Sequence, residues 1–450
     1  MGVNDQIVKS AAAAGQQPNT VQQRPKLESF AHLLHFTGVG DPPLNLLLEP
    51  RALNPGFWTR DSVKKNDALQ QILQDMLDKH PEFQKFRIAL VDLTDKLESP
   101  HFAGHQELGH GTIGSSGKMS VMYGAYQLKF DLEVFARDLD IKDKDSLFEA
   151  ARDYWSLSQV DPANAKPEEL FSGDPKLELH GSLVKKNQQK MSLECQAVEK
   201  DEKGTVVSTR KVQIGGPKLE QIFNVTKDAS GELVIAFTDE FRKKLKLMTR
   251  HSDNSAAHDC ITSIGYLYLD SALWQSDLYN PKRRGGMWLG GSYPKSIAGG
   301  KTLSILWQPA PVGDRDKKNP TRQCGTAAGA AALLTLLGQN NLVNKEASAE
   351  MRNEHLDVFA SDGYGSWMGN GLISDGRIVS NDRVFAKIGI ADGMLFDCVL
   401  ISRQDSVTNK RLRYAMVALD IPIGKPGEKL LNSMGVELDK CIQKNNPTTP

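Results

Sequence analysis

The sequence predicts an α+β protein, in which helical and strand segments occupy different stretches of the chain. Apolar residues at helical spacing mark a helix over 66–79, which Pro81 ends. An alternating, β-branched run over 86–93 marks a strand directly after it. Strand-like runs return near the C-terminus, ahead of one more helical segment. Strands at both ends of the chain, with helices between them, are typical of a sheet covered by helices.

The remaining elements follow from the same periodicities and from capping residues. Thr238, followed by two acidic residues, predicts the start of a helix that leads into His251. A run of small and aliphatic residues over 326–337 predicts another helix, with Gly338 as its C-cap. A Gly-rich stretch over 284–300 reads as irregular. Further expected elements are a weak strand over 102–108, a helix beginning near Ser115, strands over 383–390, 395–401 and 413–421, and a helix over 428–442.

Two regions differ in character from the rest. Residues 1–60 are predicted to be a disordered lead followed by a proline-broken segment that wraps the surface. Residues 176–237 hold several short strand-like runs, separated by turn signals ending in Gly204 and Gly231. We predict a β-rich insertion there, which could be a lid, a docking surface or only a packing element.

Composition excludes some classes of function. The chain has 450 residues, 40% hydrophobic content and a formal net charge of zero, so we expect no nucleic-acid partner. No stretch approaches the ~18 apolar residues of a membrane span. With no signal peptide in view, the expected location is cytoplasmic, or periplasmic or secreted if a signal was removed. Five scattered cysteines without a Cys-x-x-Cys pair suggest buried free thiols and no metal site.

The pattern Ser115-x-x-Lys118 places a hydroxyl and an amine three residues apart at a predicted helix start. Side chains at this spacing share one face of a helix, and a desolvated lysine can take the proton of a serine nucleophile. The pattern alone is weak, because about two chance copies are expected in such a chain. Four further copies, which begin at Ser62, Ser182, Ser208 and Ser292, lack the context of a strand pair followed by a helix.

Two more motifs follow in order, Ser252-Asp253-Asn254 and Lys387-Ile388-Gly389. Together with Ser115-x-x-Lys118 they resemble the S-x-x-K, S-D-N and K-T-G set of serine β-lactamases and penicillin-binding proteins. The resemblance covers residues 65–160 and 238–445. It implies a three-layer fold with an antiparallel sheet flanked by helices, plus an all-helical domain. The implied sheet domain is 61–114 with 375–450, and the implied helical domain is 115–175 with 238–374.

The resemblance also implies a role for each residue. Ser115 would be the acyl-accepting nucleophile, and Lys118 would take its proton. Ser252 would relay a proton to the leaving group, while Asn254 would hold the substrate amide and Asp253 would fix its loop. Lys387 would supply positive potential, and Gly389 would let the backbone approach the substrate. The backbone N–H groups of Ser115 and Ile390 would form the oxyanion hole. This chemistry needs no cofactor and no metal.

Two departures leave three functions open. Ile388 stands where the family usually has a hydroxyl residue that helps to bind the carboxylate of a β-lactam. No glutamate occurs between Glu240 and Glu346 to activate a deacylating water. The first hypothesis is a serine acyl hydrolase acting on an ester, amide or peptide-like substrate. The second is a penicillin-binding or D,D-peptidase-like protein with slow deacylation, and the third is a non-catalytic binding relative. Substrate identity and oligomeric state stay open.

Overall fold

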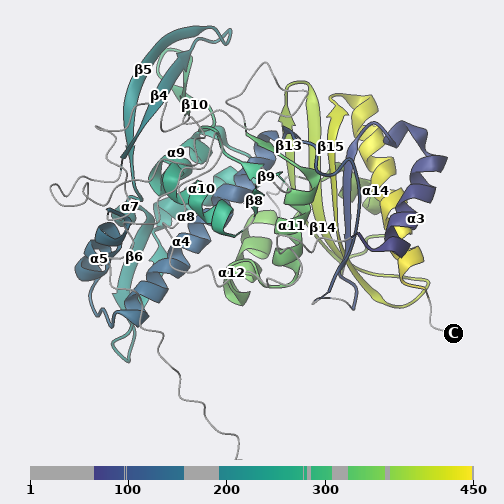
Figure 1. Ribbon diagram of the computed structural model, residues 1–450, viewed down its shortest axis with the longest axis horizontal. Helices are drawn as coiled ribbons and strands as arrows, with labels where there is room; N and C mark the ends of the chain where they lie inside the picture. Colours follow the sequence, from purple (N-terminus) through teal and green to yellow (C-terminus); the bar gives the residue numbers. More distant parts are fainter. Residues whose placement is uncertain are drawn as a thin grey trace, which may run out of the picture.

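The computed structural model describes residues 65–447, apart from 96, 98, 157–191, 277, 281–284, 307–322 and 360–364. It has the predicted α+β class, with helices packed on antiparallel sheets (Figure 1). The lead and wrapping segment over 1–60, and the part of the predicted insertion before Ser192, lie outside the described residues. Within the described part of the chain, no helix is both long and apolar enough to cross a membrane.

The main sheet joins the two ends of the described chain. Its order is β13-β14-β15-β1-β2, and every neighbouring pair is antiparallel. The N-terminal β1 lies between β15 and β2, so strands more than 300 residues apart in sequence pair directly. The strands are β1 (Arg87–Asp92), β2 (His101–His105), β13 (Arg383–Ala391), β14 (Met394–Gln404) and β15 (Arg411–Pro422).

Helices cover both faces of this sheet, which confirms the three layers (Figure 1). On one face, α3 (Asp67–Lys79), α13 (Trp367–Ser374) and α14 (Lys425–Asn445) share an apolar cluster with the strands. On the other face, α11 (Ala327–Gly338) belongs to a second cluster that continues into the helical part of the molecule. Burial of these two faces is the main stabilising term for such a layered fold.

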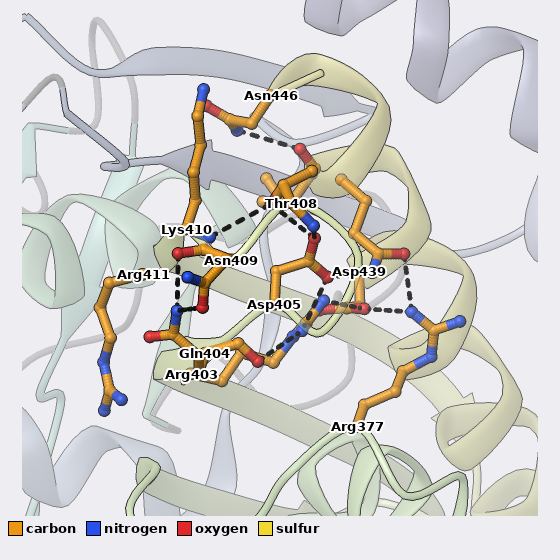
Figure 2. A network of polar contacts seen from close by, with 12 residues as sticks. Arg377, Arg403, Gln404, Asp405, Thr408, Asn409, Lys410, Arg411, Asp439 and Asn446 are labelled. Carbon is orange, nitrogen blue, oxygen red and sulfur yellow. Dashed lines mark hydrogen bonds and ion pairs between the residues drawn. The ribbon is translucent and has the colours of Figure 1, made fainter. Parts of the chain in front are cut away.

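A buried ionic network fastens α14 to the sheet (Figure 2). Arg403 of β14 donates to both carboxylate oxygens of Asp439, at 2.7 and 2.8 Å, and Arg377 donates to the same group at 2.6 Å. The hydroxyl of Tyr414 also donates to Asp439, whose side chain is fully buried. A buried carboxylate with this many donors has its charge compensated, so the network holds the last helix in one register.

The helical part contains α4 and the helices that pack around it. Thr238 caps its helix as predicted, and Thr326, expected only as the start of a helix, is also a cap; each accepts a hydrogen bond from a backbone N–H three residues on. Gly338 is the last residue of α11 and not its cap, because the cap is Gln339. The helices are α4 (Lys118–Asp138), α5 (Lys144–Ser156), α8 (Asp239–Arg250), α9 (Asn254–Ile264), α10 (Tyr266–Gln275), α12 (Lys345–Glu350) and a π-helix at Met351–Leu356.

The expectation of an irregular stretch over 284–300 is wrong. That stretch contains β9 (Gly285–Trp288) and β10 (Lys295–Ile297). β9 pairs with a short strand just before it and with a strand beyond residue 320, so its strand character comes from these partners and not from local alternation. A small sheet of order β3-β12-β9-β8 results, with β3 (Gly111–Thr112), β8 (Tyr279–Asn280) and β12 (Cys324–Gly325). The region between the Ser252-Asp253-Asn254 and Lys387-Ile388-Gly389 motifs is therefore not entirely helical.

Residues 192–237 are β-rich, as predicted. The turns at Gly204 and Gly231 have φ of 80° and 86°, values that favour glycine. The long hairpin of this region is completed by two later strands, in a sheet of order β10-β11-β4-β5, and it projects from the body at the upper left of Figure 1. The strands are β4 (Ser192–Lys200), β5 (Val206–Gly215), β11 (Lys301–Leu306) and the separate pair β6 (Phe223–Lys227) and β7 (Leu233–Phe237).

The cysteines are as predicted. All five are free thiols, and all five are buried. They behave as small apolar side chains within the packed elements.

Candidate active site

Ser115 lies in a 3₁₀ turn, Gly114–Gly117, that leads directly into α4. Its side chain is partly exposed, whereas Lys118 at the start of α4 is buried. Gly114 has φ of +48°, and a Cβ there would lie 2.7 to 2.9 Å from the backbone of Ile390. Only glycine tolerates both this conformation and this approach. The turn that carries Ser115 is therefore pressed against the end of β13.

The amine of Lys118 is the point where the first two motifs meet. Its Nζ lies 3.1 Å from the Oγ of Ser115 and donates to Oδ1 of Asn254 at 2.8 Å. It also donates to the backbone carbonyl of Ser252, whose Oγ is 3.4 Å away. Residues more than 130 positions apart thus converge on one nitrogen.

These partners account for the protons of a neutral amine. The carbonyl oxygen of Ser252 and Oδ1 of Asn254 can only accept, so they take the two N–H bonds of an uncharged Lys118. The lone pair then remains for the third neighbour, the hydroxyl of Ser115. This arrangement suits a base that receives the serine proton.

The electrostatics agree with that protonation state. Burial, and next the like charge of Lys387, lower the pKa of Lys118 to about 7, while Asp253 opposes the shift. Burial also lowers the pKa of Lys387 to about 8. Both amines are therefore largely neutral under mildly alkaline conditions, where an ordinary lysine is charged.

The loop at 252–254 is held by its own backbone. Ser252 has φ of 55°, an uncommon value for a residue with a side chain. Asp253 is the N-cap of α9, and its Oδ1 accepts from the N–H of Ala256 at 2.6 Å. Asp253 thus has the loop-fixing contact expected of it, and Asn254 begins the helix with its Oδ1 turned to Lys118.

Lys387 reaches the same loop from β13. Its side chain is 2% exposed, and its Nζ donates to the Oγ of Ser252 at 2.9 Å. The Oγ of Ser252 consequently lies between the two lysine amines. Ile388 is half-buried, and strand alternation places it on the opposite face of β13 from Lys387.

The free edge of β13 faces the serine turn. The carbonyl of Val384 accepts from Val358, outside the sheet, so the peptide groups of alternate residues point away from β14. This alternation turns the N–H of Ile390 outward, next to Gly114. Gly389 is also required, because a Cβ there would lie 2.0 Å from the carbonyl oxygen of Ile113.

One residue of the site has no signal in the sequence. Tyr293 lies in the stretch expected to be irregular, yet its ring centroid is 4.6 Å from Nζ of Lys118. Its hydroxyl donates to the carbonyl of Gly114 at 2.7 Å. No motif places this tyrosine at the site, since its contacts are made across more than 170 residues.

Comparisons with known proteins give one kind of similarity. No family model matches the chain, and no curated protein does. Solved β-lactamases are similar to the chain, at low sequence identity and low TM-score. A β-lactamase from Sphaerobacter thermophilus DSM 20745 is 9% identical, with 85% of this chain and 98% of that chain covered and a TM-score of 0.39.

Two further solved structures are similar at the same level. A class A β-lactamase from Bacteroides cellulosilyticus DSM 14838 is 9% identical over 84% of this chain and 100% of that chain, with a TM-score of 0.40. PBP-A, in an acyl-enzyme complex with penicillin G, is 11% identical over 85% and 98%, with a TM-score of 0.36. These values describe a distant likeness of fold, and the chemistry of this chain has to be judged from its own side chains.

Among the residues that the structure describes, no group of three or more His, Cys, Asp or Glu side chains is placed to hold a metal ion. The polar groups around Ser115 are instead hydroxyls, amines and an amide.

Proposed function

We propose that this chain is a serine acyl hydrolase of the β-lactamase-like superfamily, which forms an acyl-enzyme at Ser115. The observation that carries the proposal is the contact of 3.1 Å between Nζ of Lys118 and Oγ of Ser115, at an amine whose pKa is lowered to about 7. A base near its own pKa at neutral pH is suited to accept a proton and later return it. The substrate class is an ester, amide or β-lactam.

In the proposed acylation step, the Oγ of Ser115 attacks the carbonyl carbon of the substrate while its proton passes to the neutral amine of Lys118. The negative charge that develops on the carbonyl oxygen is stabilised by the N–H groups of Ser115 and Ile390. The former belongs to the first turn of a helix, whose N–H groups have no acceptor within the helix, and the latter points out from the edge of β13.

Attack of Ser115 gives a tetrahedral intermediate, and the collapse of this intermediate to the acyl-enzyme requires a proton on the leaving group. Ser252 supports a relay, because its Oγ is within 3.4 Å of Lys118 and 2.9 Å of Lys387. The proton taken from Ser115 would pass from Lys118 to the hydroxyl of Ser252, which gives its own proton to the departing oxygen or nitrogen. Asn254 and the approach allowed by Gly389 would hold the substrate.

Slow deacylation, as in a penicillin-binding or D,D-peptidase-like protein, is the second candidate. It is favoured by one feature of the sequence, the absence of glutamate from residue 241 to residue 345. Such a protein would form the same acyl-enzyme and release it slowly, because no glutamate from this stretch is available as a base for the water that attacks the ester.

The experiment is labelling followed by intact-mass measurement. The wild-type protein is incubated with an acyl phosphonate probe and, separately, with a fluorescent penicillin. Ser115→Ala is the test variant, and Ser116→Ala is its matched control, because the neighbouring hydroxyl is buried and donates to the carbonyl of Lys387 at 3.1 Å.

We expect labelling in the wild type and in Ser116→Ala, and none in Ser115→Ala. A phosphonate adduct without a penicillin adduct favours the hydrolase, and a lasting penicillin adduct favours the second candidate. Failure of both probes to modify the folded wild type would reject both enzymes and leave the non-catalytic binding relative.

A further inference from the structure

We propose that Tyr293 is a positioning residue for the Ser115–Lys118 pair: its hydroxyl fixes the turn that carries Ser115, and its ring closes one side of the Lys118 amine to water. This inference deepens the proposed function and rests on it for the catalytic readout. A second readout, the titration of Lys118 itself, does not depend on catalysis.

The hydroxyl of Tyr293 acts on the backbone of the nucleophile turn. It donates to the carbonyl of Gly114 at 2.7 Å, one residue before Ser115. A Cβ on Gly117 would lie 2.8 Å from the same hydroxyl, so the turn closes around it. Gly114 has a positive φ and no side chain, so this bond adds a direct restraint on a peptide group whose own residue makes no side-chain contact. The position of the Oγ of Ser115 follows from that peptide.

The ring of Tyr293 acts on the amine. Its centroid is 4.6 Å from Nζ of Lys118, and the tyrosine is only 5% exposed. The remaining sides of the nitrogen are occupied by Ser115, Ser252 and Asn254. The ring therefore covers the side of the nitrogen that it faces and keeps water from it. This desolvation favours the neutral amine, against the weaker attraction of the ring face for an ammonium.

Tyr293 is itself held firmly. The preceding residue, Ser292, exchanges two bonds of 2.7 Å with Ile305 of β11, one through its N–H and one through its Oγ. The Oγ of Ser292 also lies 2.9 Å from Nδ1 of His258 in α9. The backbone that carries the ring is thus held by β11 and by α9, and the hydroxyl of the ring is held by Gly114. A side chain with so little freedom is suited to set the geometry of another group.

Tyr293 is not the base. Burial raises the pKa of its phenol further above the ordinary value of 10, so it stays protonated and remains a donor. Its hydrogen is committed to the carbonyl of Gly114. The charged groups that face Lys118 are Lys387 from β13 and Asp253 from the start of α9, and variants at position 293 leave both in place.

The two roles are separated by two variants. Tyr293→Phe removes the hydroxyl and keeps the ring, so the phosphonylation rate of Ser115 should fall by about 2- to 10-fold at every pH, the worth of one hydrogen bond. Tyr293→Ala removes both and admits water. The pH range in which the labelling rate rises as Lys118 loses its proton, the acid limb of the pH–rate profile, should then lie about one pH unit or more higher. This shift is toward the ordinary lysine pKa.

Tyr123→Phe is the matched control. It removes the hydroxyl of another buried tyrosine, which donates to Oε1 of Gln127 at 3.4 Å. It should leave the position of the acid limb unchanged. If Tyr293→Ala does not fold, as judged by its near-UV circular dichroism, Tyr293→Leu replaces it, with a smaller shift in the same direction.

The second readout is the titration of Lys118 by NMR with ¹³C-labelled lysine, its signal assigned from Lys118→Met. An upward shift in Tyr293→Ala, with no shift in Tyr293→Phe, supports the proposal even if the wild type is never acylated. A titration in Tyr293→Ala that coincides with the wild type, or a profile moved by Tyr293→Phe, overturns it. Absence of labelling in the wild type would count against the proposed function alone.

Discussion

Replacing Lys387 with methionine should raise the pKa of Lys118 and move its activity to higher pH. Both amines contact the Oγ of Ser252, at 3.4 and 2.9 Å. The two nitrogens are therefore at most about 6 Å apart, and two unit charges at that distance repel by about 3 kcal/mol at an effective dielectric constant of about 20. That energy corresponds to about 2 pKa units.

The expected rise in the pKa of Lys118 is somewhat smaller than this limit of about 2 units. The pKa of Lys387 is itself about 8, so it is partly neutral in the upper part of the range. We expect Lys387→Met to raise the pKa of Lys118 by about 1 to 2 units from its value near 7. Since only the neutral amine accepts the proton of Ser115, labelling should rise through a correspondingly higher pH.

The assay is the pseudo-first-order rate of phosphonate labelling between pH 5 and pH 10, followed by intact mass. Lys295→Met is the matched control, because its ammonium is paired with Asp259 at 2.6 Å, and the charges that act on Lys118 are those of Lys387 and Asp253. This control should keep the wild-type profile. An acid limb that stays in place in Lys387→Met, or that moves to lower pH, would refute the electrostatic reasoning.

Two substitutions test how the site and the fold are held. Gly114→Ala should abolish labelling and destabilise the fold, because a Cβ would lie 2.7 Å from the backbone of Ile390. Gly204→Ala is its control, since this glycine also has a positive φ, +80°, but nothing lies within 4 Å of an added Cβ. The control should lower the free energy of unfolding in urea by only about 1–2 kcal/mol and keep full labelling. Asp439→Asn should lower the free energy of unfolding by about 3 kcal/mol, because it removes the carboxylate that both Arg403 and Arg377 contact and leaves Arg403 with the longer pair to Asp405. Its control, Asp75→Asn, should leave the free energy of unfolding nearly unchanged, since that carboxylate is exposed. Equal losses within either pair would contradict the assigned contacts.

Local patterns were sufficient for most of the elements near the site. The helix over 66–79 begins at Asn66 as its cap and ends before Pro81, because capping and the missing N–H of proline act within a few residues. The predicted strand pair before Ser115 and the apolar helix after it distinguish this serine motif from the four other S-x-x-K patterns in the sequence. The structure has β1 and β2 before Ser115, and α4 immediately after the turn.

Contacts made across long stretches of sequence could not be predicted in the same way. The strand at Gly285–Trp288 pairs with the distant β12 as well as with the neighbouring β8, whereas its own glycines suggest a loop. The place of Tyr293 depends on the bonds between Ser292 and Ile305, which bring β11 to the site. Neither pairing leaves a periodicity in the residues concerned, so only the assembled fold shows them.

The sequence predicted the positions of Ser252, Asn254 and Lys387 in the site only in part. Their order along the chain suggested a common site, and the structure brings their side chains to Lys118 and to one another. The protonation state of Lys118 depends on burial and on Lys387, neither of which is visible in a motif. Chemistry at Ser115 therefore remains a prediction that labelling has to test.

The most direct test of the account is to locate the modified residue after phosphonate labelling of the wild-type protein, by proteolysis and tandem mass spectrometry. The account predicts a single adduct on Ser115, because its Oγ lies 3.1 Å from Nζ of Lys118, the lysine of the same S-x-x-K motif. An adduct on Ser116 or Ser252 in place of Ser115, or an unmodified protein, would contradict it.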